Sequence, residues 1–248
     1  MSLHFQPLGD TGVRVQFGDR IDPAINNQIR RYCRRLKKLS LEGVVEWVPS
    51  YTAVTVYYQP YRVRYGELVR ILSELVEEIE SDQELESRLV EIPVVYGGRF
   101  GPDLEEVARY SGLTPEEVIR IHSQSPYRIY MMGFVPGFPY LGGMSETIAV
   151  PRLEKPREKI PAGSVGIAGA QTGVYPLETP GGWRLIGRTP LRLYDPHRHP
   201  PMLLAAGDHV QFRPISEEEY SSIEEEVARG KNPVKEKTWE SRTDETTD

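Results

Sequence analysis

Residues 161–187 read PAGSVGIAGAQTGVYPLETPGGWRLIG, and this alternation of turn residues with short β-forming stretches sets the fold class of the second half of the chain. The stretch lies within residues 133–214, which hold 12 of the 22 glycines and 12 of the 21 prolines. Long helices are excluded there, because proline breaks the helical hydrogen-bond ladder and glycine costs backbone entropy. The pattern predicts a compact β-barrel with tight turns. Its strands are expected at Val165–Ala168, Arg184–Ile186, Leu191–Tyr194 and Val210–Phe212.

The first ninety residues carry the two hydrophobic periodicities of a small α+β domain. Asp22 is a helix N-cap followed by Pro23 at the first helical position, and a second amphipathic helix is expected from Leu68 to Ile79. The order ββαββα favours a four-stranded sheet with both helices on one face. Its strands are expected at residues 3–8, 13–17, 44–48 and 53–58.

Composition divides the chain into three parts, and the fold class expected for the whole is α+β. Residues 1–86 form the two-layer N-terminal domain and end in a polar, acid-rich linker over residues 81–86. Residues 87–215 form the barrel domain, which includes a helical insertion. Residues 216–248 hold an acidic helix and a polar tail, which we expect to be loosely held from Gly230 onward.

The helical insertion follows a strand expected at Leu89–Tyr96 and comprises two short helices, at 102–110 and 115–122. Thr114 with Glu117 three residues on has the form of a capping box. His122 ends the second helix, where a histidine can interact with the helix dipole. A catalytic role for His122 is the alternative.

Charge and cysteine usage exclude several classes of protein. The net charge of −6 argues against general affinity for nucleic acid or an anionic membrane. No apolar run approaches the roughly 18 residues of a membrane span, and the start of the chain lacks the features of a signal peptide. Cys33 is the only cysteine, so it forms no internal disulfide, and we expect it to be a packing residue. A cytoplasmic protein is the expectation.

Several runs between residues 91 and 187 carry a family resemblance. On them, over roughly residues 3–214, the chain resembles the KipI/PxpB family, also called allophanate hydrolase subunit 1 or kinase A inhibitor. The runs are Glu91–Gly98 (EIPVVYGG), Gly101–Leu104 (GPDL), Gly133–Gly142 (GFVPGFPYLG), Pro161–Gly169 (PAGSVGIAG), Gln171–Pro176 (QTGVYP) and Thr179–Gly187 (TPGGWRLIG).

The resemblance implies a fold, an activity and partners. The barrel is expected to be cyclophilin-like. The protein is expected to be the B-subunit of an ATP-dependent 5-oxoprolinase, which opens 5-oxo-L-proline to L-glutamate together with PxpC-like and PxpA-like subunits. Two alternatives stay open. One is an inhibitor of a sensor histidine kinase, and the other is a component of an enzyme that acts on another small amide, such as urea or allophanate.

The chemistry of lactam opening directs attention to cations in the glycine-rich loops. Phosphoryl transfer to the lactam oxygen needs Mg²⁺ and cationic side chains, and the substrate carboxylate suits an arginine. Arg152 and Arg157 are our candidates for binding an anion, either the carboxylate or phosphate. The cations in or beside these loops are Arg152, Lys155, Arg157, Lys159, Arg184 and Arg188.

Neutral groups complete the candidate substrate site. Gln171, Thr172 and Tyr175 can supply hydrogen bonds suited to an amide, although each can also be an ordinary polar residue of a barrel loop. Gly181 and Gly182 precede Trp183, so backbone can approach a ligand closely while the indole forms a wall. A tight turn followed by a core tryptophan is the alternative.

The chain lacks the standard phosphate-binding motifs. It has no GxxxxGK[ST] loop, no GxGxxG run that opens a helix, and no GxSxG elbow. No catalytic residue and no metal ligands are assigned within this chain. We therefore expect ATP and Mg²⁺ to be used only in the assembled complex, where this barrel and a partner subunit complete the active site.

Overall fold

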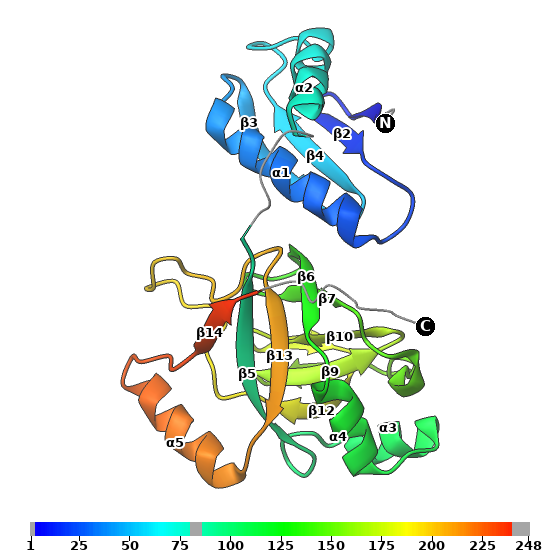
Figure 1. Ribbon diagram of the computed structural model, residues 1–248, viewed down its shortest axis with the longest axis vertical. Coiled ribbons are helices and arrows are strands. Elements are labelled where there is room, and N and C mark those ends of the chain that lie inside the picture. The colour runs from blue at the N-terminus through cyan, green and yellow to red at the C-terminus, as the bar shows by residue number, and fades with distance from the viewer. Residues whose placement is uncertain (1–2, 80–85, 240–248) are drawn as a thin grey trace, which may run out of the picture. The chain divides into compact units, whose positions relative to one another are not determined.

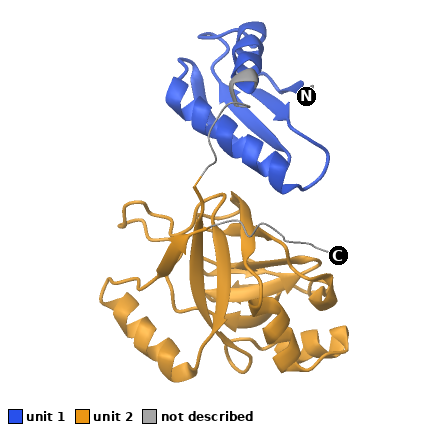
Figure 2. Cartoon of the chain, in the orientation of Figure 1, with its two compact units in different colours: residues 1–85 blue, residues 86–248 orange. Residues whose placement is uncertain are grey.

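The chain divides into two compact units, residues 1–85 and 86–248 (Figure 2). The computed structural model describes residues 3–79 and 86–239, so the expected linker at 81–86 lies outside the described residues except for Glu86. Both units combine helices with mainly antiparallel strands, which confirms the α+β class.

The first unit is one antiparallel sheet with two helices (Figure 1). The strand order is β1-β2-β4-β3, so the last two strands of the chain order are exchanged in the sheet. Its elements are β1 (His4–Leu8), β2 (Gly12–Gln16), α1 (Pro23–Leu39), β3 (Val44–Pro49), β4 (Ala53–Tyr58) and α2 (Tyr65–Ile79).

Both helices pack on the same face of this sheet. The Asp22 carboxylate accepts a hydrogen bond from the Ala24 N–H at 2.7 Å, as the sequence predicts for the cap of α1. The Tyr32 hydroxyl on α1 donates to the Leu72 carbonyl on α2 at 3.1 Å. Cys33 is half-buried against the same core, and burial raises the pKa of its thiol to about 12, in keeping with a packing residue. The buried residues of this core include Val13, Val15, Ile29, Leu36, Val54, Val56 and Leu68.

The second unit is built around an eight-stranded sheet that is nearly closed. The strand order is β10-β9-β12-β5-β13-β6-β7, and β10 and β7, at the two ends, lie next to each other. A separate ribbon pairs β11 with β8. The strands are β5 (Arg88–Tyr96), β6 (Tyr127–Met132), β7 (Pro139–Gly142), β8 (Arg157–Ile160), β9 (Ser164–Ala168), β10 (Gln171–Val174), β11 (Thr179–Gly181), β12 (Arg184–Arg188), β13 (His209–Pro214) and β14 (Lys235–Thr238).

Helices cover this sheet at its edges and ends (Figure 1). The capping box expected at Thr114 is present: its hydroxyl accepts from the Glu117 N–H at 3.2 Å, and the Glu117 carboxylate accepts from the Thr114 N–H at 2.8 Å. The helices are α3 (Leu104–Ser111), α4 (Pro115–Ser123), the short 3-10 helix η1 (Glu146–Ile148) and α5 (Glu217–Ala228).

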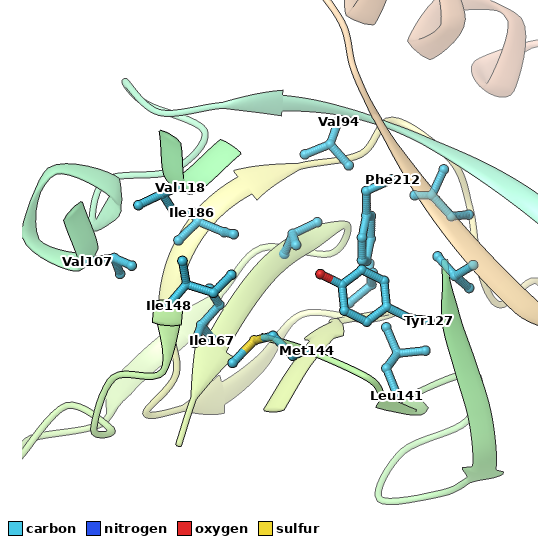
Figure 3. Close-up of a cluster of buried hydrophobic side chains, with 14 of the residues drawn as sticks. Val94, Val107, Val118, Tyr127, Leu141, Met144, Ile148, Ile167, Ile186 and Phe212 are labelled. Carbon is cyan, nitrogen blue, oxygen red and sulfur yellow. The ribbon is translucent and has the colours of Figure 1, made fainter. Parts of the chain in front are cut away.

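The core of the second unit lies inside the curled sheet. Figure 3 shows Phe212 of β13 and Tyr127 of β6 next to each other, with aliphatic side chains from other strands and from the helices around them. Their rings meet edge to face, with centroids 5.4 Å apart. Ile167 and Ile186, from β9 and β12, are fully buried in the same cluster. Burial of these side chains is the main favourable term in the stability of this unit.

The structure corrects two expectations about chain ends and strands. Residues 191–194 form no strand: Leu191 and Leu193 are buried, but the segment makes only one isolated bridge, between Tyr194 and Met202. Its apolar side chains pack in the core without strand pairing.

The tail is also more ordered than expected up to Trp239, because β14 pairs with β5 and the Trp239 indole stacks on His209 at 4.2 Å. Residues 240–248 lie outside the described part of the chain.

Gly101 gives a test of the packing between the α3 entry and β12. A Cβ at this position would lie 2.0 Å from the Ile186 carbonyl oxygen, and backbone cannot move aside cheaply. We expect Gly101→Ala to lower the free energy of unfolding by about 3 kcal/mol or more, measured by urea denaturation. Gly182→Ala is the control, since its Cβ would lie no closer than 3.6 Å to its neighbours. Equal stability of the two variants would contradict this packing.

Candidate functional site

A cavity of about 220 Å³ lies on the side of β10 that faces away from the main core. It brings together six of the eight residues that the sequence nominates, because β10, the β8–β11 ribbon and the loop before β7 converge there. Its lining residues are Phe134, Phe138, Tyr140, Arg152, Gln171, Tyr175, Pro180, Gly181, Gly182 and Trp183.

Side-chain alternation along β10 decides which polar residues reach the cavity. Successive side chains of a strand point to opposite faces. Gln171 and Tyr175, four residues apart, point to the same face and line the cavity. Val174 points to the opposite face and is fully buried in the main core. Thr172 is 1% exposed and has the same orientation as Val174. The structure therefore places Thr172 away from the cavity, unlike the sequence-based expectation for this residue.

The wall of the cavity is aromatic. Phe138 meets the rings of Tyr140, Tyr175 and Trp183 edge to face, with centroid distances of 5.2, 5.8 and 5.7 Å. Gly173 makes this packing possible: a Cβ there would lie 3.0 Å from the Trp183 ring and 3.2 Å from the Phe138 ring. Phe138, Tyr175 and Trp183 are 3, 3 and 8% exposed, so these rings form a closely packed apolar wall.

Arg152 is the cation of the cavity, and its backbone is fixed on both sides. The Pro151 carbonyl accepts a hydrogen bond from Arg184 Nε at 3.0 Å, and the Leu153 N–H donates to the Gly182 carbonyl at 2.7 Å. The Arg152 guanidinium is exposed and makes no hydrogen bond or ion pair with the described residues. Because the backbone is fixed by hydrogen bonds and the guanidinium has no ion pair, Arg152 is suited to binding an anion.

Arg157 is engaged differently. Its Nη2 donates to Asp103 Oδ1 at 2.7 Å, and the other oxygen of Asp103 accepts from the Leu185 N–H at 2.6 Å. The Asp103 side chain is only 8% exposed, so this is a mostly buried ion pair. Arg157 does not line the cavity, although its charge acts on Tyr175. Its ion pair with Asp103 gives it a structural task that Arg152 lacks.

Tyr175 is a hydrogen-bonding group that stays protonated. Burial raises the pKa of its phenol above the ordinary value, and a backbone hydrogen bond with Trp183 and the charges of Arg152 and Arg157 only partly oppose this. The hydroxyl lies against the strand β11, where a Cβ on Gly181 would come within 2.6 Å of it. Gly181 is therefore required by packing, while a Cβ on Gly182 would meet its neighbours, Leu153 and Pro156, only at ordinary van der Waals distances of 3.6 Å or more.

His122 does not act as the charged end of a helix, so that expectation is wrong. Its ring is fully buried and stacks on Phe212 at 4.5 Å. Burial lowers the pKa of His122 to about 3, so the ring is neutral near pH 7 and cannot offer a positive charge to the helix dipole.

The hydrogen bonds of His122 fix its tautomer. The Thr172 hydroxyl donates to the Gly166 carbonyl at 3.0 Å, so it must accept from His122 Nε2–H, at 2.8 Å. Nδ1 is then free to accept from the Tyr96 hydroxyl, also at 2.8 Å. The result is one directed chain of hydrogen bonds, from Tyr96 on β5 through His122 and Thr172 to Gly166 on β9. It holds β10 from the core side, behind the cavity wall.

Sequence reasoning missed four lining residues: Phe134, Phe138, Tyr140 and Pro180. Three of them belong to the run 133–142, which carries the family resemblance without any assigned role. Three aromatic side chains within ten residues, in a run that also holds three glycines and two prolines, were the available signal.

Neither a membrane span nor a metal centre appears in the part of the chain that the structure describes. No helix over residues 3–79 and 86–239 is long and apolar enough to cross a bilayer. Over the same residues, no three His, Cys, Asp or Glu side chains gather as metal ligands would.

The fold and the cavity define a class of protein: a two-unit α+β chain in which a nearly closed sheet carries a cavity lined by aromatic side chains. A family model for the carboxyltransferase domain, subdomain C and D, matches residues 3–204. The chain belongs to this family, and within it to the KipI/PxpB proteins.

Known relatives agree with this placement. The 5-oxoprolinase B-subunit of Bacillus subtilis (strain 168) is 48% identical over 238 residues, which cover 91% of this chain and 99% of that protein. The protein of the same name from Escherichia coli O157:H7 is 45% identical over 210 residues, which cover 85% and 95%. The crystal structure of Kluyveromyces lactis urea carboxylase matches 96% of this chain and 24% of its own, with a TM-score of 0.76. At 21% identity, that last likeness shows a shared fold alone.

The buried histidine predicts an acid-sensitive stability. Its pKa is about 3 in the folded protein and near 6.5 when unfolded, so the unfolded chain binds the proton more readily between these values. Stability therefore falls as the pH drops from about 6 toward 4, by up to about 1.4 kcal/mol per pH unit from this group. Urea denaturation of the wild type and of His122→Gln at about pH 6 and about pH 4.5 measures it. The variant is expected to have the shallower dependence, and equal slopes would contradict a neutral buried histidine.

Proposed function

We propose that this chain is the B-subunit of an ATP-dependent 5-oxoprolinase and that its cavity binds 5-oxo-L-proline while the ring is opened to L-glutamate. The relatives named as B-subunits of 5-oxoprolinase, at 45% and 48% identity over most of the chain, support the assignment. The observation that carries it is the unpaired Arg152 guanidinium beside Gln171 and an aromatic wall, all in one cavity.

Each part of the lactam has a matching group in the cavity. The carboxylate of 5-oxo-L-proline pairs with Arg152, which has no other anion to neutralise it among the described residues. The lactam N–H and C=O are hydrogen-bonded by Gln171 and by the protonated Tyr175. The flat apolar ring packs on Trp183 and Phe138. Arg157 acts indirectly, since its ion pair with Asp103 braces β8 beneath Gly181.

ATP and Mg²⁺ belong to the assembled complex in this proposal. The described residues offer no cluster of carboxylates that would hold Mg²⁺, and the chain has no glycine loop of the phosphate-binding kinds. A PxpC-like subunit and a PxpA-like subunit would then supply the nucleotide site and the remaining chemistry. The near closure of the sheet supports a cyclophilin-like barrel as the scaffold of this half-site.

Arginine variants test the assignment in the reconstituted complex. Arg152→Ala is expected to raise the KM for 5-oxo-L-proline by roughly tenfold to a hundredfold, the loss of one charge-assisted hydrogen-bonding group. ADP release that depends on 5-oxo-L-proline is the measurement. Arg157→Ala should lower both activity and thermal stability, because it leaves Asp103 buried without its partner.

Arg109→Ala is the matched control, since this arginine is 80% exposed on α3 and outside the cavity. Unchanged turnover and KM for Arg152→Ala would remove Arg152 from the substrate site, and unchanged activity and thermal stability for Arg157→Ala would contradict its bracing role. Release of ADP in response to urea or another amide, but not to 5-oxo-L-proline, would transfer the function to a different small-amide enzyme.

The proposal also predicts that the purified single chain has negligible turnover. The described residues that line the cavity include no carboxylate, histidine or cysteine, so the cavity alone has no group suited to proton transfer near neutral pH. The measurement is ADP and glutamate release by the chain alone and after addition of the partner subunits. Substantial turnover by the chain alone would overturn the proposal of a shared active site.

A further inference from the structure

We propose that Phe134 is a specificity-determining residue at the rim of the cavity, which we call the lip. Its exposed ring would cover the flat face of a small bound ligand. The inference rests on the proposed function only in taking 5-oxo-L-proline as the ligand. Phe134 lines the cavity, and its side chain is 65% exposed.

The ring continues the aromatic wall. It meets Phe138 edge to face, with centroids 5.6 Å apart and planes at 78°. Phe138 in turn contacts Trp183 and Tyr175, so the wall runs from the buried part of the cavity to its exposed rim. An exposed phenylalanine forgoes most of the stabilisation that burial gives. The fold therefore gains little from an aromatic residue at this position.

The backbone at Phe134 is strained. Its φ is +65°, and among the described residues the only other non-glycine with positive φ is Ser40, at the end of α1. The Val135 N–H donates to the Gly133 carbonyl at 2.8 Å, so Phe134 is the central residue of a γ-turn in its rare, positive-φ form. Glycine would adopt this conformation without strain.

The same loop is rigid enough to present the ring in one place. The Gly133 N–H donates to the Phe138 carbonyl at 3.1 Å, and the Phe138 N–H donates to the Val135 carbonyl, also at 3.1 Å. These bonds close the loop between β6 and β7. A preorganised contact loses little conformational entropy when a ligand binds.

Strain and exposure at one residue, without benefit to the core, are typical of functional positions. The occupant we assign is the ligand, because the ring belongs to the cavity wall and has its edge on Phe138. A face over the lactam ring contributes equally to substrate and transition state, so its loss acts on KM more than on kcat.

The test uses the reconstituted complex with 5-oxo-L-proline and four variants. Phe134→Ala and Phe134→Gly are expected to raise KM by roughly tenfold with kcat changed much less. Phe134→Tyr keeps the ring and should recover most of that loss. Tyr110→Ala is the control: it removes a side chain that is 62% exposed on α3 and does not line the cavity, and both constants should stay at their wild-type values.

The isolated chain reports the strain separately. Both small residues remove the ring, but only glycine relieves the positive φ, so Phe134→Gly should melt roughly 2–4 °C above Phe134→Ala. Equal melting temperatures of the two variants would show that the backbone at residue 134 is not strained, and would contradict the inference.

Three outcomes in the complex are decisive. An unchanged KM in Phe134→Ala, with a raised KM in Arg152→Ala, would contradict the proposed role of Phe134 but not the proposed function. Loss of the partner proteins on co-purification of Phe134→Ala would also contradict that role, since the ring would then be an interface residue. An unchanged KM in both variants would instead count against the cavity as the substrate site.

Discussion

The two faces of β9 and β10 separate the core of the second unit from its cavity. Side chains that alternate along these strands enter either the main hydrophobic core or the aromatic cluster at the cavity. The direction of the β10 side chains depends on this register, because a shift by one residue would exchange Gln171 with Thr172. The hydrogen-bond chain through His122 and Thr172 to Gly166 fixes it from the core side. A neutral histidine is essential to that chain, since protonation would remove the acceptor that Tyr96 uses.

Two arginines of similar sequence context have different tasks because their surroundings differ. Arg157 pairs with a buried carboxylate, and removing one member of such a pair leaves the other unpaired in a poorly solvated place. Arg152 has its neighbouring backbone held by hydrogen bonds and its guanidinium in solvent at the cavity. Charge in the first case stabilises the ribbon, and in the second it is available to a ligand. Sequence alone treats the two as equivalent, since both follow proline in the same loop region.

The parts of the fold and the site that depend on contacts between neighbouring residues could be predicted from the sequence. The parts that depend on pairing between distant strands could not. The caps of α1 and α4 are contacts within a few residues, so the sequence predicts where these helices begin. The strand expected at residues 191–194 was wrong because buried apolar residues need not pair, and β14 was missed because only its pairing with β5 makes it a strand. In the site, residue type was enough to nominate arginine, glutamine and glycine. The direction of the Thr172 side chain depends on the pairing of β10, and the neutral state of His122 follows from its burial; only the assembled sheet produces either.

The composition of the cavity indicates what this chain can do by itself. Its described lining offers one unpaired cation, neutral hydrogen-bonding groups and aromatic faces, which is a set suited to holding a flat anionic molecule. Burial raises the pKa of Tyr175 above its ordinary value, so its phenol stays protonated near neutral pH, and the two carboxylate oxygens of Asp103 accept hydrogen bonds from Arg157 and the Leu185 N–H. A pocket that holds a ligand without transferring protons needs its reacting groups from outside, which is the division that the proposed shared site assumes. The Phe134 ring fits this division as a uniform binding contact: it would hold the ligand equally in the ground state and the transition state, and groups outside the pocket would carry the chemistry.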